Sequence, residues 1–553
     1  MQGLSPMNAR SAQDYYCSIV AALKQKNVPP GGEAMIEAIL AAVPVGAAKI
    51  IDLGCNTGWV ARQVAKAFPS ARVLGLDINP AMIDAAEAAA RQEQSSAVFA
   101  CVDGAAMQTL AAGADVIICG GSAAFFEDPA AVYRAVTGCL KPGGLLIDCH
   151  YVYDADVPAD LRREERAMFG LGWMPKGLSA IAGVYEEAGL TMAAIRRLPR
   201  FAFEDSAAAV LAREILQGVP EMQELVQAMT KRRALINALS GYRYPYLLVA
   251  SSGTPAAQAP GAGERDLTKA IATLDLFSMP IARQPMSVLR DYLPYRFLAY
   301  VGDPDAAPGG GRAVETLART LETLGIGQKG RVLDIGCFTG LSSIVLASHF
   351  EGVIGLDIEA EFVEIAGSIG RALLSPAQFL VGDGSRTGYA PASFDAVTMT
   401  ATLAYTPRPQ ALLAEASRIL KSDGLLAEFV YHHFDRAPET AEKIQAAVGP
   451  DVVLAPLSRR LDMFETAGFD LVELNAVETG AASSSEQTVL RDYVVHREHV
   501  LDPCKSREDL KAFADLFTHY TGRLSDCLDK PVAYLGVFSK SGQGNRPCNQ
   551  NRD

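Results

Sequence analysis

Two short segments of the chain combine an acidic residue with closely spaced glycines and a threonine. Residues 52–58 read Asp-Leu-Gly-Cys-Asn-Thr-Gly, and residues 334–340 read Asp-Ile-Gly-Cys-Phe-Thr-Gly. Each segment follows an apolar run and opens a helical pattern, so its glycines let the backbone turn tightly and approach a ligand. The helix that begins there also offers unpaired backbone N–H groups. These two loops therefore predict sites for a small polar ligand.

The details of the loops argue against a dinucleotide. A dinucleotide fingerprint needs glycine at 56 and glycine or alanine at 59, where this chain has Asn56 and Trp59. The acidic residue that opens each loop, Asp52 or Asp334, would repel a pyrophosphate. It suits a ligand that carries a positive sulfonium and an ammonium group. A nicotinamide-dependent protein is therefore the weaker hypothesis.

The loops belong to a longer repeat. The run V-L-G-L-D that ends at Asp77 is matched by V-I-G-L-D ending at Asp357, and Asp-Gly at 103–104 is matched by Asp-Gly at 383–384. The matches keep a nearly constant offset, which indicates an internal duplication rather than two unrelated α/β domains. We expect a first domain over 1–250, a linker over 251–285, a second domain over 286–541 and a disordered tail over 542–553.

The elements that position the loops follow an α/β pattern. In the first half, β-rich runs at 49–53, 72–77, 97–102, 115–119, 144–149 and 246–250 alternate with helical stretches. Continuous apolar runs fit strands buried on both faces, so we expect a mostly parallel sheet flanked by helices. Such a sheet binds its ligand beyond the carboxyl ends of its strands. Residues 151–240 are mostly helical, and we expect much of this region to cap the substrate site.

The ordered set of motifs resembles the class I S-adenosylmethionine-dependent methyltransferases. The loop D-x-G-C-x-T-G is similar to that family's first motif, and Asp after strand two, Asp-Gly after strand three and L-K-P-G-G before strand five follow in order. The resemblance covers roughly 30–250 and 286–540. It implies two Rossmann-like domains, each a mostly parallel seven-stranded sheet flanked by helices, with helical cap segments.

The resemblance also implies a role for each matching position. The loop residues line the amino-acid moiety and ribose, and the acid after strand two accepts both ribose hydroxyls. The isoleucine after that acid flanks the adenine ring of the cofactor, and the aspartate of the Asp-Gly pair accepts a hydrogen bond from the adenine amino group. The end of strand four forms the floor between the cofactor and the substrate. In the first copy these residues are Asp52, Gly54, Asn56, Gly58, Asp77, Ile78, Asp103, Gly104 and Cys119. In the second copy they are Asp334, Gly336, Gly340, Asp357, Ile358, Asp383, Gly384 and Met399.

The second copy departs from the family pattern at the middle position of its loop. Asn56 tolerates left-handed dihedral angles, whereas Phe338 tolerates them poorly. Either the second loop takes a different path, or its site binds weakly. We favour two intact sites, because the second copy retains all of its acidic residues.

Catalytic residues are harder to predict, because methyl transfer mainly requires alignment of its reactants. A general base is needed only where the acceptor must lose a proton. His150 and Tyr151 follow strand five, and Tyr431 and His432 occupy the matching region. We expect these four residues to be the catalytic candidates. A histidine that only caps the strand or pairs with a surface carboxylate, and tyrosines that only fill the core, are the alternatives.

Bulk properties limit the partners. The net charge of -13 disfavours a nucleic acid, and no apolar run is long enough to span a membrane. The ten cysteines form no Cys-x-x-Cys pair, so we expect no metal site. We expect a cytoplasmic protein, from a bacterium by its Ala-rich composition, and leave a homodimer open.

The sequence therefore predicts methyl transfer from S-adenosyl-L-methionine to a small molecule, a metabolite or natural product, with S-adenosyl-L-homocysteine as the product. The two domains would then either perform sequential methylations or modify two sites of one metabolite. In the alternative, the first domain is catalytic and a degenerate second domain regulates it or binds substrate. A non-enzymatic scaffold is disfavoured by the acidic residues that both copies retain.

Overall fold

The computed structural model describes residues 29–153, 157–200, 202, 220–253, 310–432, 455–478 and 532–541. The chain divides into two compact units, and the division falls between residues 255 and 256. Most of the predicted linker and the whole predicted tail lie outside the described residues, so the domain bounds stay predictions. No helix in the described ranges is long and apolar enough to cross a membrane.

The first unit is built on a seven-stranded sheet with the order β3-β2-β1-β4-β5-β7-β6. Strands β1 to β5 run parallel, and β7 lies antiparallel between β5 and β6. The bounds are β1 (Lys49–Leu53), β2 (Arg72–Asp77), β3 (Val98–Cys101), β4 (Ala114–Cys119), β5 (Leu140–Tyr153), β6 (Thr191–Arg197) and β7 (Arg243–Ser251). Six of these strands were predicted; β6 was not named, and β5 continues beyond its predicted end.

The second unit repeats this sheet strand for strand, in the order β10-β9-β8-β11-β12-β14-β13. Here too, the last strand along the chain is the antiparallel one. The bounds are β8 (Arg331–Ile335), β9 (Gly352–Asp357), β10 (Gln378–Val381), β11 (Phe394–Thr400), β12 (Leu420–His432), β13 (Phe469–Glu478) and β14 (Val532–Lys540). The predicted fold class, two mostly parallel seven-stranded sheets with flanking helices, is confirmed.

Helices cover both faces of each sheet, as the alternation of side chains along the strands requires. In β5, Ile147 and Cys149 join the core beneath α2 (Glu33–Ala42) and α3 (Trp59–Ala67). Asp148, between them, points to the opposite face, toward α6 (Pro129–Cys139) and α8 (Leu178–Ala188).

The second unit follows the same rule. Ala427 and Phe429 of β12 pack with α14 (Gly310–Thr323) and α15 (Leu341–Leu346), while Glu428 meets α20 (Leu457–Thr466) on the other face. The remaining longer helices are α4 (Pro80–Glu93), α16 (Ala360–Ala372) and α18 (Pro409–Ile419).

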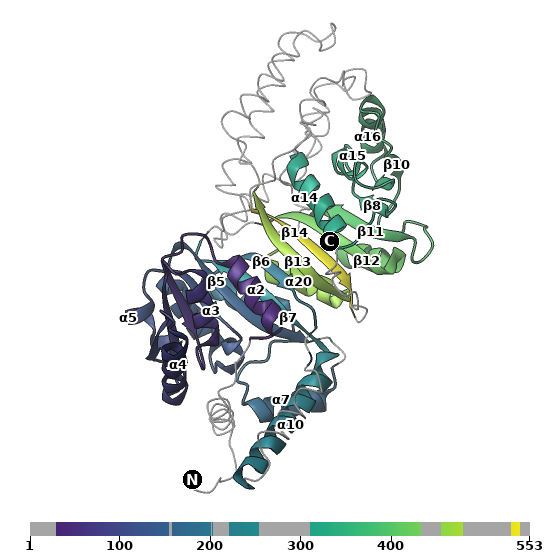
Figure 1. Cartoon of the computed structure of the whole chain (residues 1–553). Coiled ribbons are helices and arrows are strands. Elements are labelled where there is room, and N and C mark those ends of the chain that lie inside the picture. The colour runs from purple at the N-terminus through teal and green to yellow at the C-terminus, as the bar shows by residue number, and fades with distance from the viewer. Residues whose placement is uncertain are drawn as a thin grey trace. The chain divides into compact units, whose positions relative to one another are not determined.

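The predicted cap is smaller than the whole of residues 151–240. Figure 1 shows α7 (Ala159–Phe169) and α10 (Pro220–Ser240) side by side, and an apolar cluster that contains Phe169, Leu235 and Leu239 joins them. The intervening α8 and β6 instead pack against α6 and β7, so they belong to the sheet and its flank. Within the described parts of residues 151–240, the two-helix segment is the one that has the character of a cap.

A buried ion pair attaches this cap to the sheet. Arg243 at the start of β7 donates to Glu165 of α7, and their side chains are only 5% and 3% exposed. The Tyr153 hydroxyl donates to the same carboxylate at 2.5 Å, and the Arg243 guanidinium lies 3.8 Å from the centre of the Tyr151 ring. Removal of one partner would leave an uncompensated buried charge.

We predict that Glu165→Ala lowers the free energy of unfolding by about 3–5 kcal/mol, because Arg243 then stays buried without its carboxylate. Chemical denaturation measures the change. The matched control is Glu164→Ala, since Glu164 is an exposed neighbour on the same helix and its loss should cost no more than about 0.5 kcal/mol. Equal effects of the two substitutions would contradict the anchoring role.

Candidate functional site

Each glycine loop lies where the strand order of its sheet reverses. β1 pairs with β2 on one side and β4 on the other, and β8 pairs likewise with β9 and β11. At such a point the connections leave in opposite directions and open a crevice beyond the strand ends. The predicted site residues of each copy gather around this crevice.

The two loops follow the same path. Asn56 and Phe338 both have φ of 51°, in the left-handed region. The backbone N–H of Asn56 donates to Oδ2 of Asp77 at 2.8 Å, and that of Phe338 donates to Oδ2 of Asp357 at 2.9 Å. Of the two alternatives that the sequence left open for Phe338, a different loop path is therefore excluded. The hydrogen bond, with edge contact between the Phe338 and Phe362 rings, holds a conformation that costs a non-glycine residue about 1–3 kcal/mol.

The first glycine of each loop is required by its surroundings. Gly54 and Gly336 have φ of 70° and 73°. A Cβ atom on Gly54 would overlap the Ser122 side chain, and one on Gly336 would overlap Thr402. Each hydroxyl also donates to the carbonyl just before its glycine. The loop is thereby fixed to the segment after the fourth strand of its unit.

The carboxylate after the second strand has spare capacity to accept hydrogen bonds. Besides the loop N–H, Asp77 accepts the N–H of Asn79 at 2.9 Å, and Asp357 accepts that of Glu359 at 3.0 Å. Each carboxylate oxygen thus keeps a further lone pair for a ligand donor. Burial raises the pKa of both acids, because it disfavours the charged carboxylate.

An exposed apolar side chain stands next to each of these acids. Ile78 is 59% exposed and Ile358 is 65% exposed, although the strands before them are buried. An acceptor carboxylate beside an open apolar surface suits a ligand that joins hydroxyl donors to a flat ring. The structure brings both pairs together as the sequence predicted.

The Asp-Gly pairs differ between the units. Asp103 is exposed, and its Oδ1 accepts the N–H of Ala105 at 2.9 Å. Asp383 accepts the N–H and the hydroxyl of Ser385, and its Oδ2 lies 3.4 Å from Arg408. Hydrogen bonds from Ser385 hold the pKa of Asp383 below its usual value. A ligand amino group at Asp383 would therefore compete with an arginine that the first unit lacks.

The acids that open the loops are buried beneath them. Asp52 is 1% exposed and accepts the N–H of Ala61 at 3.0 Å. Asp334 is fully buried and accepts the hydroxyls of Ser342, Ser343 and Thr398 at 2.5, 2.6 and 2.9 Å. Both carboxylates therefore lie beneath the loop and are separated from the crevice by the loop backbone.

The residues predicted to form the floor end the fourth strand of each unit. The side chains of Cys119 and Met399 are fully buried, so only the backbone of these residues is available to a ligand. The next turn of the chain is left-handed in both units, at Gly121 and Ala401. In the first unit, a Cβ on Gly121 would overlap Pro30, so the segment before α2 packs onto this floor. Gly104 and Gly384 leave room for Leu53 and Ile335, respectively.

Comparisons with known proteins agree with this geometry. A model for a methyltransferase domain matches residues 50–144, and a second such model matches residues 333–428. The chain thus carries two methyltransferase domains in tandem, one in each unit.

Curated relatives resemble short stretches of the chain. A malonyl-[acyl-carrier protein] O-methyltransferase of Hahella chejuensis is 32% identical over 98 residues, 18% of this chain and 34% of that protein. A trans-aconitate 2-methyltransferase of Methylobacterium radiotolerans is 37% identical over 109 residues, 20% of this chain and 40% of that protein. The chain thus spans between a third and two fifths of the length of these relatives.

A solved structure resembles more of the chain at low identity. The Haemonchus contortus phosphoethanolamine N-methyltransferase 2, in complex with S-adenosyl-L-methionine, is 14% identical. The match covers 92% of this chain and 98% of that chain, with a TM-score of 0.34.

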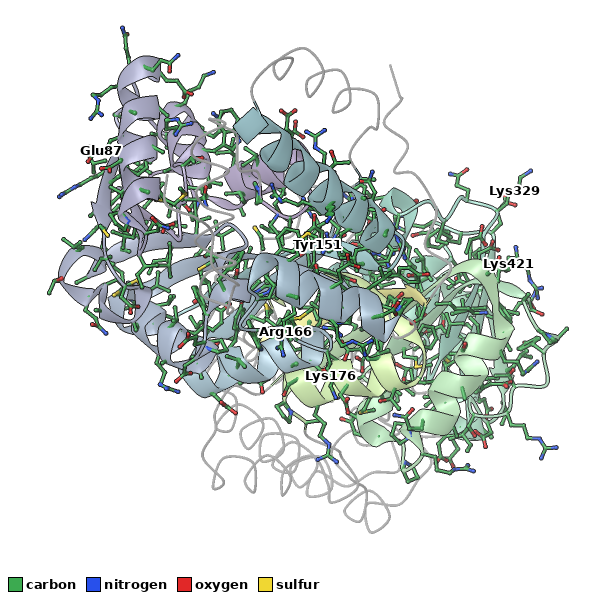
Figure 2. The ribbon with its side chains drawn as sticks, turned by 90° about the horizontal axis from the view of Figure 1, so that it is seen from below. Glu87, Tyr151, Arg166, Lys176, Lys329 and Lys421 are labelled. Carbon is green, nitrogen blue, oxygen red and sulfur yellow. The ribbon has the colours of Figure 1, made fainter. Side chains whose placement is uncertain are left out.

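Of the catalytic candidates of the first methyltransferase domain, His150 is buried and Tyr151 is half-buried. His150 is 4% exposed and its Nε2 lies 3.0 Å from Asp148, a buried acid rather than a surface one. The Tyr151 hydroxyl accepts the N–H of Gly31 at 3.3 Å. Figure 2 labels Tyr151, and Glu87 on helix α4. Tyr431 and His432 end strand β12, but their side chains lie outside the described residues.

Sequence reasoning missed two charged groups of the first domain. Asp148 and Arg243 are buried beside His150 and Tyr151, respectively. The available signal was their position inside apolar strands, where a charge needs a partner. Among the described residues, no group of three or more potential ligands is placed to hold a metal ion.

We predict that Asp52 makes the stability of the first domain depend on pH. Burial raises its pKa to about 7, against 3.8 for the free carboxyl group. Between these values the folded domain keeps a proton that the unfolded chain has lost, so stability falls as pH rises. Between pH 5 and pH 7 the free energy of unfolding of the first domain should fall by up to about 3 kcal/mol.

Asp52→Asn should remove this part of the pH dependence, since the amide oxygen can still accept the Ala61 N–H. Denaturation at pH 5 and pH 7 measures it. Asp84→Asn, an exposed change on α4, is the control and should behave as wild type. Parallel pH curves for wild type and Asp52→Asn would contradict the buried, proton-binding carboxylate.

Proposed function

We propose that each domain binds S-adenosyl-L-methionine and transfers its methyl group to a small-molecule acceptor. The observation that carries this proposal is the arrangement found twice: a left-handed loop residue tied to the acid after the second strand, with an exposed isoleucine next to it. When bound, S-adenosyl-L-methionine supplies a methyl group activated on a sulfonium centre.

The residues of the crevice fit that cofactor. Asp77 and Asp357 would hold the ribose hydroxyls with their remaining lone pairs, and Ile78 and Ile358 would cover the adenine. The carboxylates of Asp77 and Asp357, which accept the loop N–H groups, favour a cationic ligand over a pyrophosphate. These features support the cofactor and disfavour a nicotinamide dinucleotide.

The chain itself mainly has to align the acceptor and to exclude water. In the first domain, the turn at Gly31, the Tyr151 ring and the α7–α10 cap border the carboxyl edge of the sheet. His150 and Tyr151 are the proposed catalytic residues there, and Tyr431 and His432 occupy the matching strand of the second domain. A base among them would take the acceptor's proton where the acceptor has one.

The second candidate function makes the second domain a helper. Phe338 and the contact between Arg408 and Asp383 favour it, because both occupy places that the cofactor would need. We rank it below two active domains, since the second loop keeps the path and the hydrogen bond of the first.

A labelled-methyl assay tests the proposal. The full chain is incubated with methyl-labelled S-adenosyl-L-methionine and a panel of organic acids, phenols, amines and thiols that includes trans-aconitate. Asp77→Ala and Asp357→Ala each remove two ligand hydrogen bonds to a charged group, which should weaken cofactor binding by about a hundredfold or more. We therefore expect each to abolish a different part of the labelling.

The controls are Asp84→Ala and Glu364→Ala, exposed acids on the helices that follow the two binding acids. If Asp357→Ala leaves all labelling intact, the second domain is a helper. If no acceptor gains label and neither acid affects cofactor binding, the proposed function is wrong.

A further inference from the structure

A buried polar cluster lies on the α6 and α8 face of the first domain. The hydroxyls of Tyr133 and Tyr185 both donate to Oδ2 of Asp148, the second at 2.7 Å, and Nε2 of His150 lies 3.0 Å from the same oxygen. The Trp173 ring stands edge-on to His150, with 5.4 Å between ring centres. Asp148 is fully buried. One carboxylate oxygen therefore collects three side-chain donors from three elements.

The contacts assign the roles within this cluster. Burial, with the nearby Asp148, raises the pKa of Tyr133 and Tyr185, so both keep their protons and act as donors. A carboxylate only accepts, so Nε2 of His150 must carry the proton it shares with Asp148. Nδ1 has no hydrogen-bond partner among the described residues. In a neutral ring, the basic lone pair of His150 is then on Nδ1.

The cluster adjoins the floor of the crevice. Asp148 pairs in register with Cys119, the last residue of β4, so His150 lies beyond the end of that strand. Trp173, which packs on His150, donates its backbone N–H to Ala124 at 3.0 Å. Ala124 belongs to the turn Ser122–Phe125 that follows the floor. Trp173 therefore contacts both His150 and the segment Ser122–Phe125, which also lies against Gly54.

The second domain shows that the fold does not require this cluster. Glu428 stands at the same register position, opposite Met399, but it pairs with Arg460 of α20. The repeat places Leu413 where the first domain has Tyr133, and Val430 where it has His150. A buried acid at this position can therefore be satisfied by one arginine. The extra donors of the first domain serve the histidine.

We propose that Asp148 is a positioning residue that fixes His150 with its proton on Nε2 and its lone pair on Nδ1, so that Nδ1 accepts the proton of the methyl acceptor. Tyr133 and Tyr185 hold Asp148 in turn. The inference rests on the proposed function. As the acceptor atom bonds to the methyl carbon, the carbon–sulfur electron pair stays on sulfur, and the acceptor's proton passes to Nδ1. The first domain would thus take acceptors that must lose a proton, such as phenols or ammonium groups.

Nitrogen NMR of the full chain labelled in histidine tests this without a known acceptor. His150→Gln identifies the His150 signals among those of seven histidines. We expect a protonated Nε2 and a bare Nδ1 in the neutral ring. S-adenosyl-L-homocysteine, with binding followed by calorimetry on the same sample, should shift the Nδ1 signal. That shift should persist in Asp357→Ala and vanish in Asp77→Ala.

Two variants separate positioning from a structural role. Asp148→Asn should release the fixed tautomer and lower the first domain's turnover by about 10²–10⁴-fold at unchanged cofactor affinity. Glu428→Gln, the matched change in the second domain, should leave the His150 signals unaltered. Tyr185→Phe removes one donor and serves if Asp148→Asn does not fold.

A proton on Nδ1 of the neutral ring would overturn the inference. The inference would also be overturned if the His150 signals did not shift although calorimetry showed S-adenosyl-L-homocysteine bound to the first domain. If calorimetry shows no binding at all, the proposed function itself fails.

Discussion

The hydrogen bond from the glycine loop to the acid after the second strand is the constraint on which each site depends. Asp77 receives the N–H of Asn56, and Asp357 that of Phe338, each from a residue in the left-handed region. The same carboxylates receive the first N–H of the next connection. One side chain thus sets the distance between two strand ends. The remaining lone pairs of this carboxylate are then available to a ligand in the crevice.

The two domains share this backbone but differ in how they neutralise their buried charges. Burial raises the pKa of both Asp52 and Asp334, but Asp52 accepts one backbone N–H, whereas Asp334 accepts three hydroxyls. The acid on the fifth strand meets two tyrosines and a histidine in the first domain, and an arginine in the second. Since the strands and registers match, these differences concern chemistry more than folding. We expect these differences to determine which methyl acceptor each of the two sites takes.

Much of this could be predicted from the sequence, and the exceptions have physical reasons. The bounds of β1 and β2 were predicted to the residue, because continuous apolar runs that end in a functional acid have few alternatives. Strand β6, Thr191–Arg197, lacked such a pattern and ends in two arginines. Its pairing with β7 defines it, and that contact is distant in sequence.

The site was predicted less completely than the fold. Local preference alone left the path of the loop at Phe338 undecided, whereas the Asp357 carboxylate and the Phe362 ring together hold Phe338 in a left-handed conformation. Likewise, the environment of His150 depends on Tyr133 and Tyr185, which are near it only in space. Tertiary partners of this kind leave no mark on a local motif.

The central claim is that one chain holds two cofactor sites, and native mass spectrometry of the full chain with saturating S-adenosyl-L-homocysteine tests it most directly. The account predicts two bound molecules per chain, and one in either Asp77→Ala or Asp357→Ala. A single bound molecule in the wild type, lost with Asp77→Ala and kept with Asp357→Ala, would contradict it.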